Sequence, residues 1–178
     1  MEVLNPFHDR PAEWDLYSPL MGESMLELGN KKNGAATYKR FFESKGYRHV
    51  SVDWNGEDGA LKRDLRQPLN LGTFDMVSNI GTTEHVAGQE AVWRNVIEAM
   101  HVGSALVSTT PMPGQWSWHG EWYPTDAFYR SLAALNGLEI ERLYVSGVEP
   151  RKMWFFRAIR RQAGTFQMPD ARLIYRNR

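Results

Sequence analysis

The sequence predicts an α/β fold: a doubly wound, mostly parallel seven-stranded sheet with helices on both faces and a C-terminal antiparallel hairpin. Short runs rich in strand-forming residues alternate with segments of helical periodicity, as in proteins whose parallel strands are joined by crossover helices. The last two strand-like runs break this alternation, because only the seven residues 146–152 separate them. Such a link is too short for a helical crossover, so this pair is expected to be an antiparallel hairpin.

Seven segments carry the strand pattern, and glycine or proline ends several of them. Gly29 follows the first segment, Pro68 stops the weak third one, and Pro111 follows the fifth. In chain order, the expected strands are 25–28, 49–53, 61–65, 74–79, 105–109, 139–145 and 153–159.

Three segments have helical periodicity, with apolar side chains three and four residues apart. Residues suited to helix ends flank them: Gly46 is a good C-terminal stop for the first helix, and Thr125 is a good N-cap for the third. The expected helices cover 35–45, 89–100 and the segment between Thr125 and Gly137.

The length of 178 residues fits one domain, expected at 21–161, with an irregular N-terminal arm (1–20) and a C-terminal tail (162–178). Hydrophobic residues make up 42% and charged residues 24%, which excludes disordered and fibrous classes. The absence of cysteine excludes disulfide scaffolds, cysteine-bound metals and thiol nucleophiles. No membrane-spanning run and no signal-peptide pattern is visible, so a cytoplasmic protein is expected.

The zero net charge hides an asymmetry between the two parts of the chain. Residues 151–178 hold eight Lys/Arg and one acid, whereas residues 1–150 hold 13 Lys/Arg and 20 acids. A basic tail can bind nucleic acid or an anionic surface, and it can equally lie against an acidic body or in solvent. The second interpretation is favoured, because no nucleic-acid-binding signature surrounds the tail.

A ligand site is expected at the turn after the first strand. In doubly wound sheets, ligands bind at the carboxyl ends of the strands, where the strand order reverses. Gly29 would let the backbone approach such a ligand closely. Asp53, at the end of the second strand and 24 residues beyond Gly29, could accept hydrogen bonds from both ribose hydroxyls of an adenosine-type ligand. The same charge disfavours a 2′-phosphate, and therefore NADP.

A second group of candidates lies beyond the fourth and fifth strands. His85 and His119 have the side-chain type suited to base catalysis at neutral pH. The segment 111–124 is rich in aromatic residues and lies where substrate loops usually occur. Its rings could stack on a substrate, pack on the core or form an interface between chains. The candidate substrate-binding residues are Glu84, Trp116, Trp118, Trp122 and, in the following helix, Arg130, which could pair with an anionic acceptor.

Taken together, these segments resemble the class I S-adenosylmethionine-dependent methyltransferases, over about residues 23–160. The resemblance lies in Glu-Leu-Gly after the first strand, Val-Asp closing the second, Arg63-Asp64, the run FDMVSNIGTTEHV and the terminal hairpin. It implies an enzyme that uses S-adenosylmethionine to methylate a hydroxyl or an amine of a small molecule or glycan. The implied cofactor residues are Glu27, Gly29, Asn30, Asp53, Asp64, Leu65, Asn79, Ile80 and Gly81.

The turn departs from the family pattern, because Asn30 and Lys31 stand where further glycines are usual. Asn30 could substitute, since asparagine tolerates positive φ better than most residues. The departure also motivates an alternative, a non-catalytic binding or scaffold protein of the same fold. A nicotinamide-dependent oxidoreductase shares the glycine turn and the acid, but the chain lacks a Tyr-x-x-x-Lys pair. No motif such as His-Glu-x-x-His is present, so no metal is expected.

Overall fold

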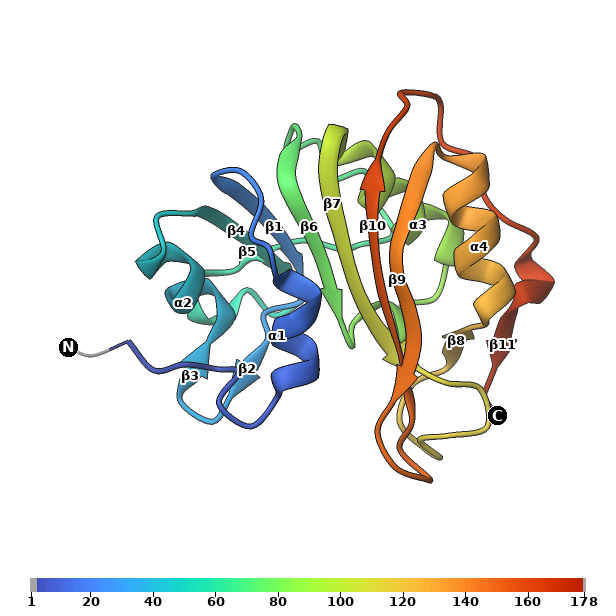
Figure 1. The fold of residues 1–178 in the computed structure, drawn as a ribbon, viewed down its shortest axis with the longest axis horizontal. Coiled ribbons are helices and arrows are strands. Elements are labelled where there is room, and N and C mark those ends of the chain that lie inside the picture. Colours follow the sequence, from blue (N-terminus) through green and yellow to red (C-terminus); the bar gives the residue numbers. More distant parts are fainter. Residues whose placement is uncertain (1–2, 178) are drawn as a thin grey trace.

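The computed structural model describes residues 3–177, and a seven-stranded mixed sheet organises them (Figure 1). The strand order is β5-β4-β1-β6-β7-β10-β9. The first five strands in this order run parallel, and β10 is antiparallel to both of its neighbours. This architecture confirms the predicted fold class, including the C-terminal hairpin. The sheet strands are β1 (Ser24–Leu28), β4 (Arg48–Asp53), β5 (Leu61–Lys62), β6 (Phe74–Ile80), β7 (Met100–Pro111), β9 (Leu138–Ser146) and β10 (Met153–Arg160).

Helices and short strands complete the fold. The α-helices are α1 (Pro11–Tyr17), α2 (Tyr38–Ser44), α3 (Gln89–Glu98) and α4 (Asp126–Leu135), and the 3₁₀ helices are η1 (Glu57–Gly59), η2 (Thr83–His85) and η3 (Ala171–Leu173). Two further pairs of antiparallel strands are β2 (Lys32–Asn33) with β3 (Ala36–Thr37), and β8 (Trp122–Pro124) with β11 (Ile174–Arg176). Thr125 caps α4 as expected, because its Oγ1 accepts a hydrogen bond from the Phe128 amide at 3.2 Å.

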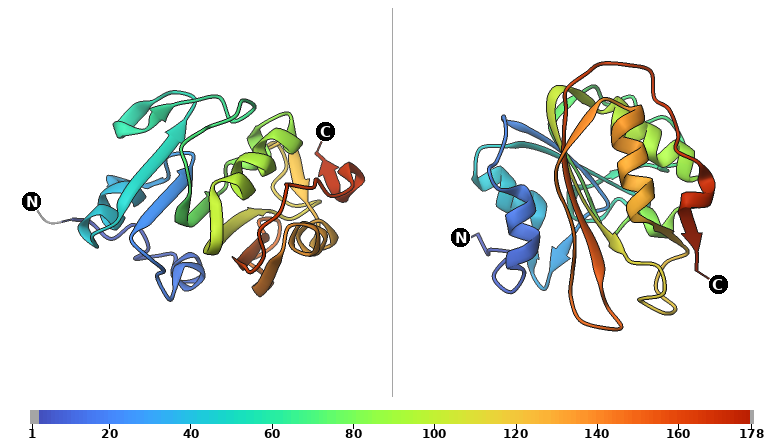
Figure 2. Two further views of the ribbon diagram at one scale, coloured as in Figure 1. Left: turned by 90° about the horizontal axis from the view of Figure 1, so that it is seen from above. Right: turned by 45° about the vertical axis from the view of Figure 1, so that its right-hand side comes forward.

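Helices cover both faces of the sheet (Figure 2). On one face, α1 and α2 enclose an aromatic core that includes Phe7, Tyr38 and Phe42. On the other face, α3 and α4 pack Trp93 and Phe128 into a second core. Because β5, β4, β1, β6 and β7 run parallel, their carboxyl ends lie along one edge of the sheet.

The N-terminal arm is not irregular throughout, because residues 11–17 form α1. Pro11 occupies the first turn, where its missing amide proton costs nothing, and Leu16 and Tyr17 are buried against the sheet. A seven-residue helix has too few turns to produce a clear periodicity in the sequence. Its stability therefore comes from tertiary packing and not from local propensity.

The C-terminal tail also packs against the body. Its strand β11 pairs with β8, and Phe166 and Ile174 are buried in the core beside α3 and α4. Arg176 of the tail pairs with Glu121 on the body, and Arg161, directly before the tail in the basic region 151–178, pairs with Glu139. These contacts agree with the favoured interpretation of the basic tail as a segment lying against the acidic body.

The crossover connection from β5 to β6 has no helix. The expected third strand is reduced to β5, and residues 63–73 form an irregular segment whose Leu65 and Leu69 are nevertheless buried. Asn95 of α3 satisfies the backbone there: its amide nitrogen donates to the Leu65 and Gln67 carbonyls, and its oxygen accepts from the Leu69 amide. Buried backbone groups need such partners, which a helix would otherwise provide.

Within residues 3–177, the longest helices have ten residues, and none has the length and apolar character needed to cross a bilayer.

Candidate active site

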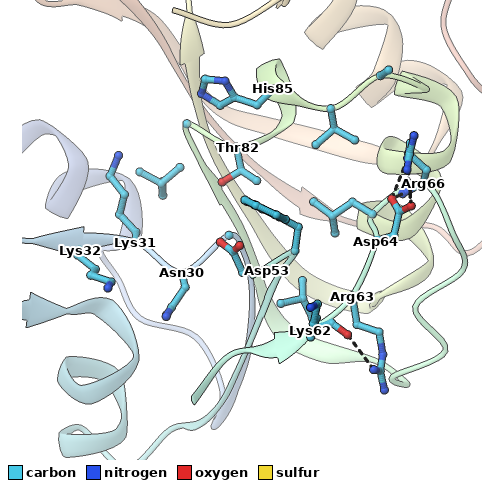
Figure 3. A pocket seen from close by; sticks show the side chains of 18 residues that line it. Asn30, Lys31, Lys32, Asp53, Lys62, Arg63, Asp64, Arg66, Thr82 and His85 are labelled. Atoms are coloured by element: carbon cyan, nitrogen blue, oxygen red, sulfur yellow. Dashed lines mark hydrogen bonds and ion pairs between the residues drawn. The ribbon is translucent and has the colours of Figure 1, made fainter. Parts of the chain in front are cut away.

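A cleft of about 1010 Å³ opens at the carboxyl ends of β1, β4 and β6. The strand order reverses here, because the chain crosses from β1 to β4 on one side and later to β6 on the other. Seven of the nine predicted cofactor residues line it: Gly29, Asn30, Asp53, Asp64, Leu65, Ile80 and Gly81. In the view of Figure 3, Asp53 and Thr82 lie in the middle, with Lys31 at the left, His85 above Thr82, and Asp64 and Arg66 at the right.

Gly29 forms the tight turn that the sequence indicated. Its φ of 81° is in the left-handed region, and a Cβ atom built there would lie 2.4 Å from the Oγ1 of Thr82. That hydroxyl donates to the Leu28 carbonyl at 2.9 Å, which joins the end of β1 to the segment after β6. Any side chain at Gly29 would break this junction at the base of the cleft.

The turn after Gly29 directs two of its side chains away from the cleft centre. Asn30 donates from Nδ2 to the Glu57 carbonyl at 2.9 Å, and Lys32 forms an ion pair with Asp58. Asn30 is not among the residues with positive φ, so it does not replace a glycine in the expected way. Instead, its side chain links the turn to η1, and the cleft stays open despite the missing glycines.

Carboxylates mark the opposite side of the cleft. Asp53 is the last residue of β4, and its Oδ1 accepts from the Asn55 amide at 3.1 Å. Asp64 pairs with Arg66, whose guanidinium lowers the pKa of Asp64 to about 2. Trp54 also lines the cleft and is 79% exposed. Trp54 was not predicted to line the cleft, although it is a large aromatic residue directly after the acid that ends β4.

Glu27 and Asn79 lie beneath the cleft and not in its wall. Both are completely buried. Glu27 accepts the Lys31 amide at 2.9 Å and so shapes the glycine turn from below. Asn79 donates to the hydroxyls of Thr83 and Ser108, at 3.0 and 2.9 Å. In this structure these two predicted residues support the walls of the cleft from below.

A buried histidine that the sequence did not single out, His49, lies beside Glu27. The Nε2 of His49 lies 3.4 Å from the Glu27 carboxylate, and both side chains are inaccessible to solvent. Burial raises the pKa of Glu27 to about 8 and lowers the pKa of His49 to about 3. Both groups are therefore neutral at pH 7, which avoids placing two charges in the interior.

The two predicted catalytic histidines meet at one end of the cleft. His85 lines the cleft, and its ring centroid lies 4.7 Å from that of His119 in an edge-on arrangement. Between them is the carboxylate of Glu84, whose Oε1 is 3.9 Å from the Nε2 of His85 and 3.6 Å from the Nε2 of His119. Burial lowers the pKa of His85. The fold thus joins residues from η2 and from the aromatic loop, which are more than 30 positions apart in the chain.

The aromatic loop is fastened to η2 by its backbone. The Glu121 amide donates to the Glu84 carbonyl at 2.8 Å. A Cβ atom at Gly120 would lie 2.7 Å from the Cγ of Glu84, so only glycine allows this approach. Tyr123 holds the loop from the other side, because its hydroxyl donates to the Trp116 carbonyl at 2.8 Å. His119 is positioned by these contacts.

The predicted substrate-binding residues separate into two groups. Trp116 and Trp118 line a second, smaller hollow of about 420 Å³, together with His119 and Arg151. Trp122 and Arg130 line neither hollow. Trp122 packs against the core with the guanidinium of Arg176 over its ring. Arg130 is exposed on α4 and pairs with Asp126 at 2.7 Å, so its position gives no support to the expected contact with an anionic acceptor.

No protein-family model matches the sequence, and no curated protein resembles it in sequence. Solved structures do resemble it. The 1,6-didemethyltoxoflavin-N1-methyltransferase of Burkholderia thailandensis, solved with S-adenosylhomocysteine, matches 86% of this chain and 78% of its own, with a TM-score of 0.66 and 12% identity. An S-adenosylmethionine-dependent methyltransferase of Mesorhizobium loti matches 85% and 97%, with a TM-score of 0.62 and 16% identity.

A third structure, the N-methyltransferase NodS of Bradyrhizobium japonicum with S-adenosylhomocysteine, matches 89% of each chain at a TM-score of 0.58 and 14% identity. Together with the strand order, these matches show that the chain has the fold of class I S-adenosylmethionine-dependent methyltransferases. The matches establish the fold, whereas the reaction of a protein depends on the residues of its site.

Proposed function

We propose that this protein is an S-adenosylmethionine-dependent methyltransferase acting on a hydroxyl or an amine of a small molecule or glycan. The observation that carries the proposal is the open cleft at the strand-order reversal, with Gly29 at its base and the Asp53 carboxylate in its wall. Its volume of about 1010 Å³ is large enough for a nucleoside-sized ligand, since such sites usually measure about 300–1000 Å³.

Each part of the cleft suits one part of the cofactor. Asp53 would accept hydrogen bonds from the ribose hydroxyls, and Asp64, Leu65 and the exposed ring of Trp54 would lie around the adenine. The backbone at Gly29 and Gly81 would pass under the methionine portion. When bound, S-adenosylmethionine supplies a methyl group that its sulfonium has already activated. The protein has to align the acceptor with that methyl group and exclude water.

The position of the histidine pair favours an acceptor site next to the cleft. His85 lines the cleft, His119 lines the smaller aromatic hollow, and their rings are in contact. An acceptor stacked on Trp116 or Trp118 would reach the cleft at these two imidazoles. Either imidazole could receive the proton that a hydroxyl or ammonium acceptor loses. Trp118 is 95% exposed, which leaves its ring available for such a ligand.

Calorimetric titration with S-adenosylhomocysteine tests the cofactor site. We expect binding to the wild type and a loss of about 1.5–3 kcal/mol in Asp53→Ala, as for hydrogen bonds to a charged group. Asp15→Ala is the matched control, because Asp15 is exposed on α1, outside the cleft. Equal affinity of all three proteins would reject the assignment of Asp53, and no binding by folded wild type would reject the cofactor site.

A second function is favoured by Lys31, which stands in the cleft where the family usually has glycine. In this second function the protein binds a ligand but transfers no methyl group, as a scaffold protein that retains the fold would. The two functions differ in turnover: a methyltransferase converts S-adenosylmethionine to S-adenosylhomocysteine in the presence of a hydroxyl or amine acceptor. A protein that binds the cofactor but forms no product with a broad acceptor panel would support the scaffold function.

A further inference from the structure

The carboxylate of Glu84 is in an unusual position for a charged group. Its side chain is completely buried, and neither carboxylate oxygen has a hydrogen-bond partner among the described residues. A buried carboxylate without donors is costly unless a positive charge compensates it. Lys31 lies near this end of the cleft but forms no ion pair with Glu84 in residues 3–177. The groups that face Glu84 directly are the imidazoles of His85 and His119.

Three potential ligand atoms converge at this point. One nitrogen from each imidazole and one carboxylate oxygen of Glu84 all lie within 4.8 Å of one another. Donors that share one ion at about 2.0–2.2 Å lie roughly 3–4 Å apart, which is close to the 3.6 and 3.9 Å measured from Glu84 to the two imidazoles. Small changes of side-chain torsion would therefore bring all three atoms onto a common ion.

The chemistry of this set points to a particular class of ion. Two imidazoles and one carboxylate are a ligand combination found for zinc and for other divalent first-row transition metals, whereas magnesium and calcium prefer sites made of oxygen atoms. The imidazoles are partly exposed, with 46% and 41% of their side-chain surface accessible. An ion held by them would keep coordination positions open toward solvent or a ligand.

From this geometry we infer that Glu84, His85 and His119 form a binding site for one divalent transition-metal ion, at the junction of the cleft and the aromatic hollow.

The surrounding structure holds the ligands in place. The segment that carries Glu84 and His85 is fixed at its start, where the Thr83 amide donates to Asn79 at 3.0 Å. It is also fixed at its end, because Gln89 donates to the carbonyls of Thr83 and Val86 at 2.7 and 2.8 Å. The hydrogen bond from the Glu121 backbone amide to the Glu84 carbonyl holds the loop that carries His119. Supporting contacts of this kind hold metal ligands in a binding geometry.

The metal site has a consequence that rests on the proposed methyltransferase function. An ion at this junction would bind the oxygen of a hydroxyl acceptor and lower the pKa of that hydroxyl. The acceptor hydroxyl could then release its proton to solvent water, to which the partly exposed cluster is open, without either histidine acting as the base. His85 and His119 would then act as ligands of the metal ion. The methyl acceptors would be restricted to groups that bind a metal through oxygen.

The test is calorimetric titration of the untagged, chelator-treated full chain with ZnCl₂, followed by absorption spectroscopy with Co²⁺. We expect one ion per chain. His85→Ala and His119→Ala should each weaken Zn²⁺ binding by more than about tenfold, the lower range for loss of even an outer-sphere partner. Glu84→Gln, which keeps the shape of the side chain, should do the same, with its folding verified by circular dichroism.

His101→Ala is the matched control. His101 is also partly exposed and lies 3.1 Å from a carboxylate, that of Asp75, but it is outside the cluster. The site is overturned if folded wild type binds no Zn²⁺, if the cluster variants bind as tightly as wild type, or if His101→Ala weakens binding equally. Because these readouts use the metal alone, they are independent of the titration with S-adenosylhomocysteine, and either proposal can fail without the other.

Discussion

At the residue scale, ionisable side chains lie at both ends of the cleft. At the side assigned to the adenosine portion, Asp53 and Asp64 lie among three cations, Lys62, Arg63 and Arg66. At the other end, the Nζ of Lys31 lies 3.6 Å from the position that a Cβ atom of Gly81 would occupy. A cation at this end would complement the carboxylate of the cofactor's methionine portion. The residue that departs from the family pattern can therefore be a binding residue.

We expect Lys31→Met to weaken binding of S-adenosylhomocysteine by about tenfold or more, the usual effect of losing a charged hydrogen-bond partner. Binding of adenosine, which lacks the methionine portion, should not change. Calorimetry with both ligands measures the difference. Lys62→Met is the control, because Lys62 lines the cleft on the side of Asp53, at the end of β5. Equal losses for both ligands would place Lys31 in contact with the adenosine portion instead.

A second effect at this scale comes from the buried pair beneath the turn. The pKa of Glu27 is raised from 4.5 to about 8 by burial, so the folded state keeps a proton that the unfolded state has already released. The contribution of Glu27 to stability is therefore complete below about pH 4.5 and is lost as the pH rises through 8. Burial lowers the pKa of His49 from 6.5 to about 3. The contribution of His49 to stability therefore increases as the pH rises from about 3 to 6.5 and is constant above that range.

We expect the free energy of unfolding to fall between pH 6.5 and 8 by up to about 1.4 kcal/mol per pH unit, the slope for one proton. Glu27→Gln, which cannot ionise, should show a flatter profile over this range. Urea denaturation at several pH values measures both profiles. Parallel profiles for the two proteins would show that Glu27 is already ionised in the folded state.

At the scale of elements, the loop between β7 and β8 depends on contacts with distant segments. The hydroxyl of Tyr123 donates to the Trp116 carbonyl and accepts from the amide of Gly120 and the side chain of Asn177. The backbone amide of Asn177 also donates to the backbone carbonyl of Glu121, at 2.8 Å. The end of the C-terminal tail thus fastens the loop that carries His119, and a long loop without internal secondary structure becomes ordered.

Tyr123→Phe should release this loop while keeping the buried ring. We expect a loss of about 1–2 kcal/mol in the free energy of unfolding, because the remaining polar groups lose a buried partner. We also expect faster hydrogen exchange of the amides in 114–120. Tyr175→Phe, on the neighbouring strand β11 and 49% exposed, serves as the control. Unchanged exchange in Tyr123→Phe would mean that other contacts hold the loop.

At the scale of the whole molecule, a buried arginine connects the N-terminal arm to the C-terminal hairpin of the sheet. Arg157 of β10 is completely buried, and its guanidinium donates to the carbonyls of Leu16 and Pro19 at 2.6 and 3.0 Å. It also pairs with the carboxylate of Glu141 at 2.7 Å. Arg157 therefore attaches the end of α1 and the residues after it to the sheet, beside the hydrogen bond that Arg142 of β9 donates to the Asp15 carbonyl.

We expect Arg157→Met to destabilise the fold by about 3–5 kcal/mol, because it leaves buried carbonyl groups and a carboxylate without their partner. Arg161→Met is the matched control: Arg161 pairs with Glu139 at the same 2.7 Å distance but is 53% exposed, and an exposed pair contributes little. Chemical denaturation of the three proteins compares them. Similar stability of Arg157→Met and wild type would show that the other contacts of the arm hold it without Arg157.

Local signals in the sequence determined the class of fold and most of the cleft. Strand and helix periodicities, the glycine after β1 and the acid ending β4 are properties of short segments, and the parallel topology brings the ends of those strands to one edge. For this reason, Gly29, Asp53, Ile80 and Gly81 could be predicted to share one site. Thr82 lines the same cleft, and it was missed because nothing in its local pattern distinguishes it from an ordinary loop residue. Trp54 was missed although it directly follows the acid that ends β4.

The tertiary structure alone determined which residues contact His85 and His119, and where the N-terminal arm and the C-terminal tail pack. Glu84, His85 and His119 form a cluster because Gly120 allows the aromatic loop to lie against η2, a contact between segments far apart in the chain. Helix α1 and strand β11 form because they cover apolar surface on the sheet and on β8. Both outcomes depend on packing and on satisfying buried polar groups, which are properties of the assembled molecule and leave no periodic trace in the sequence.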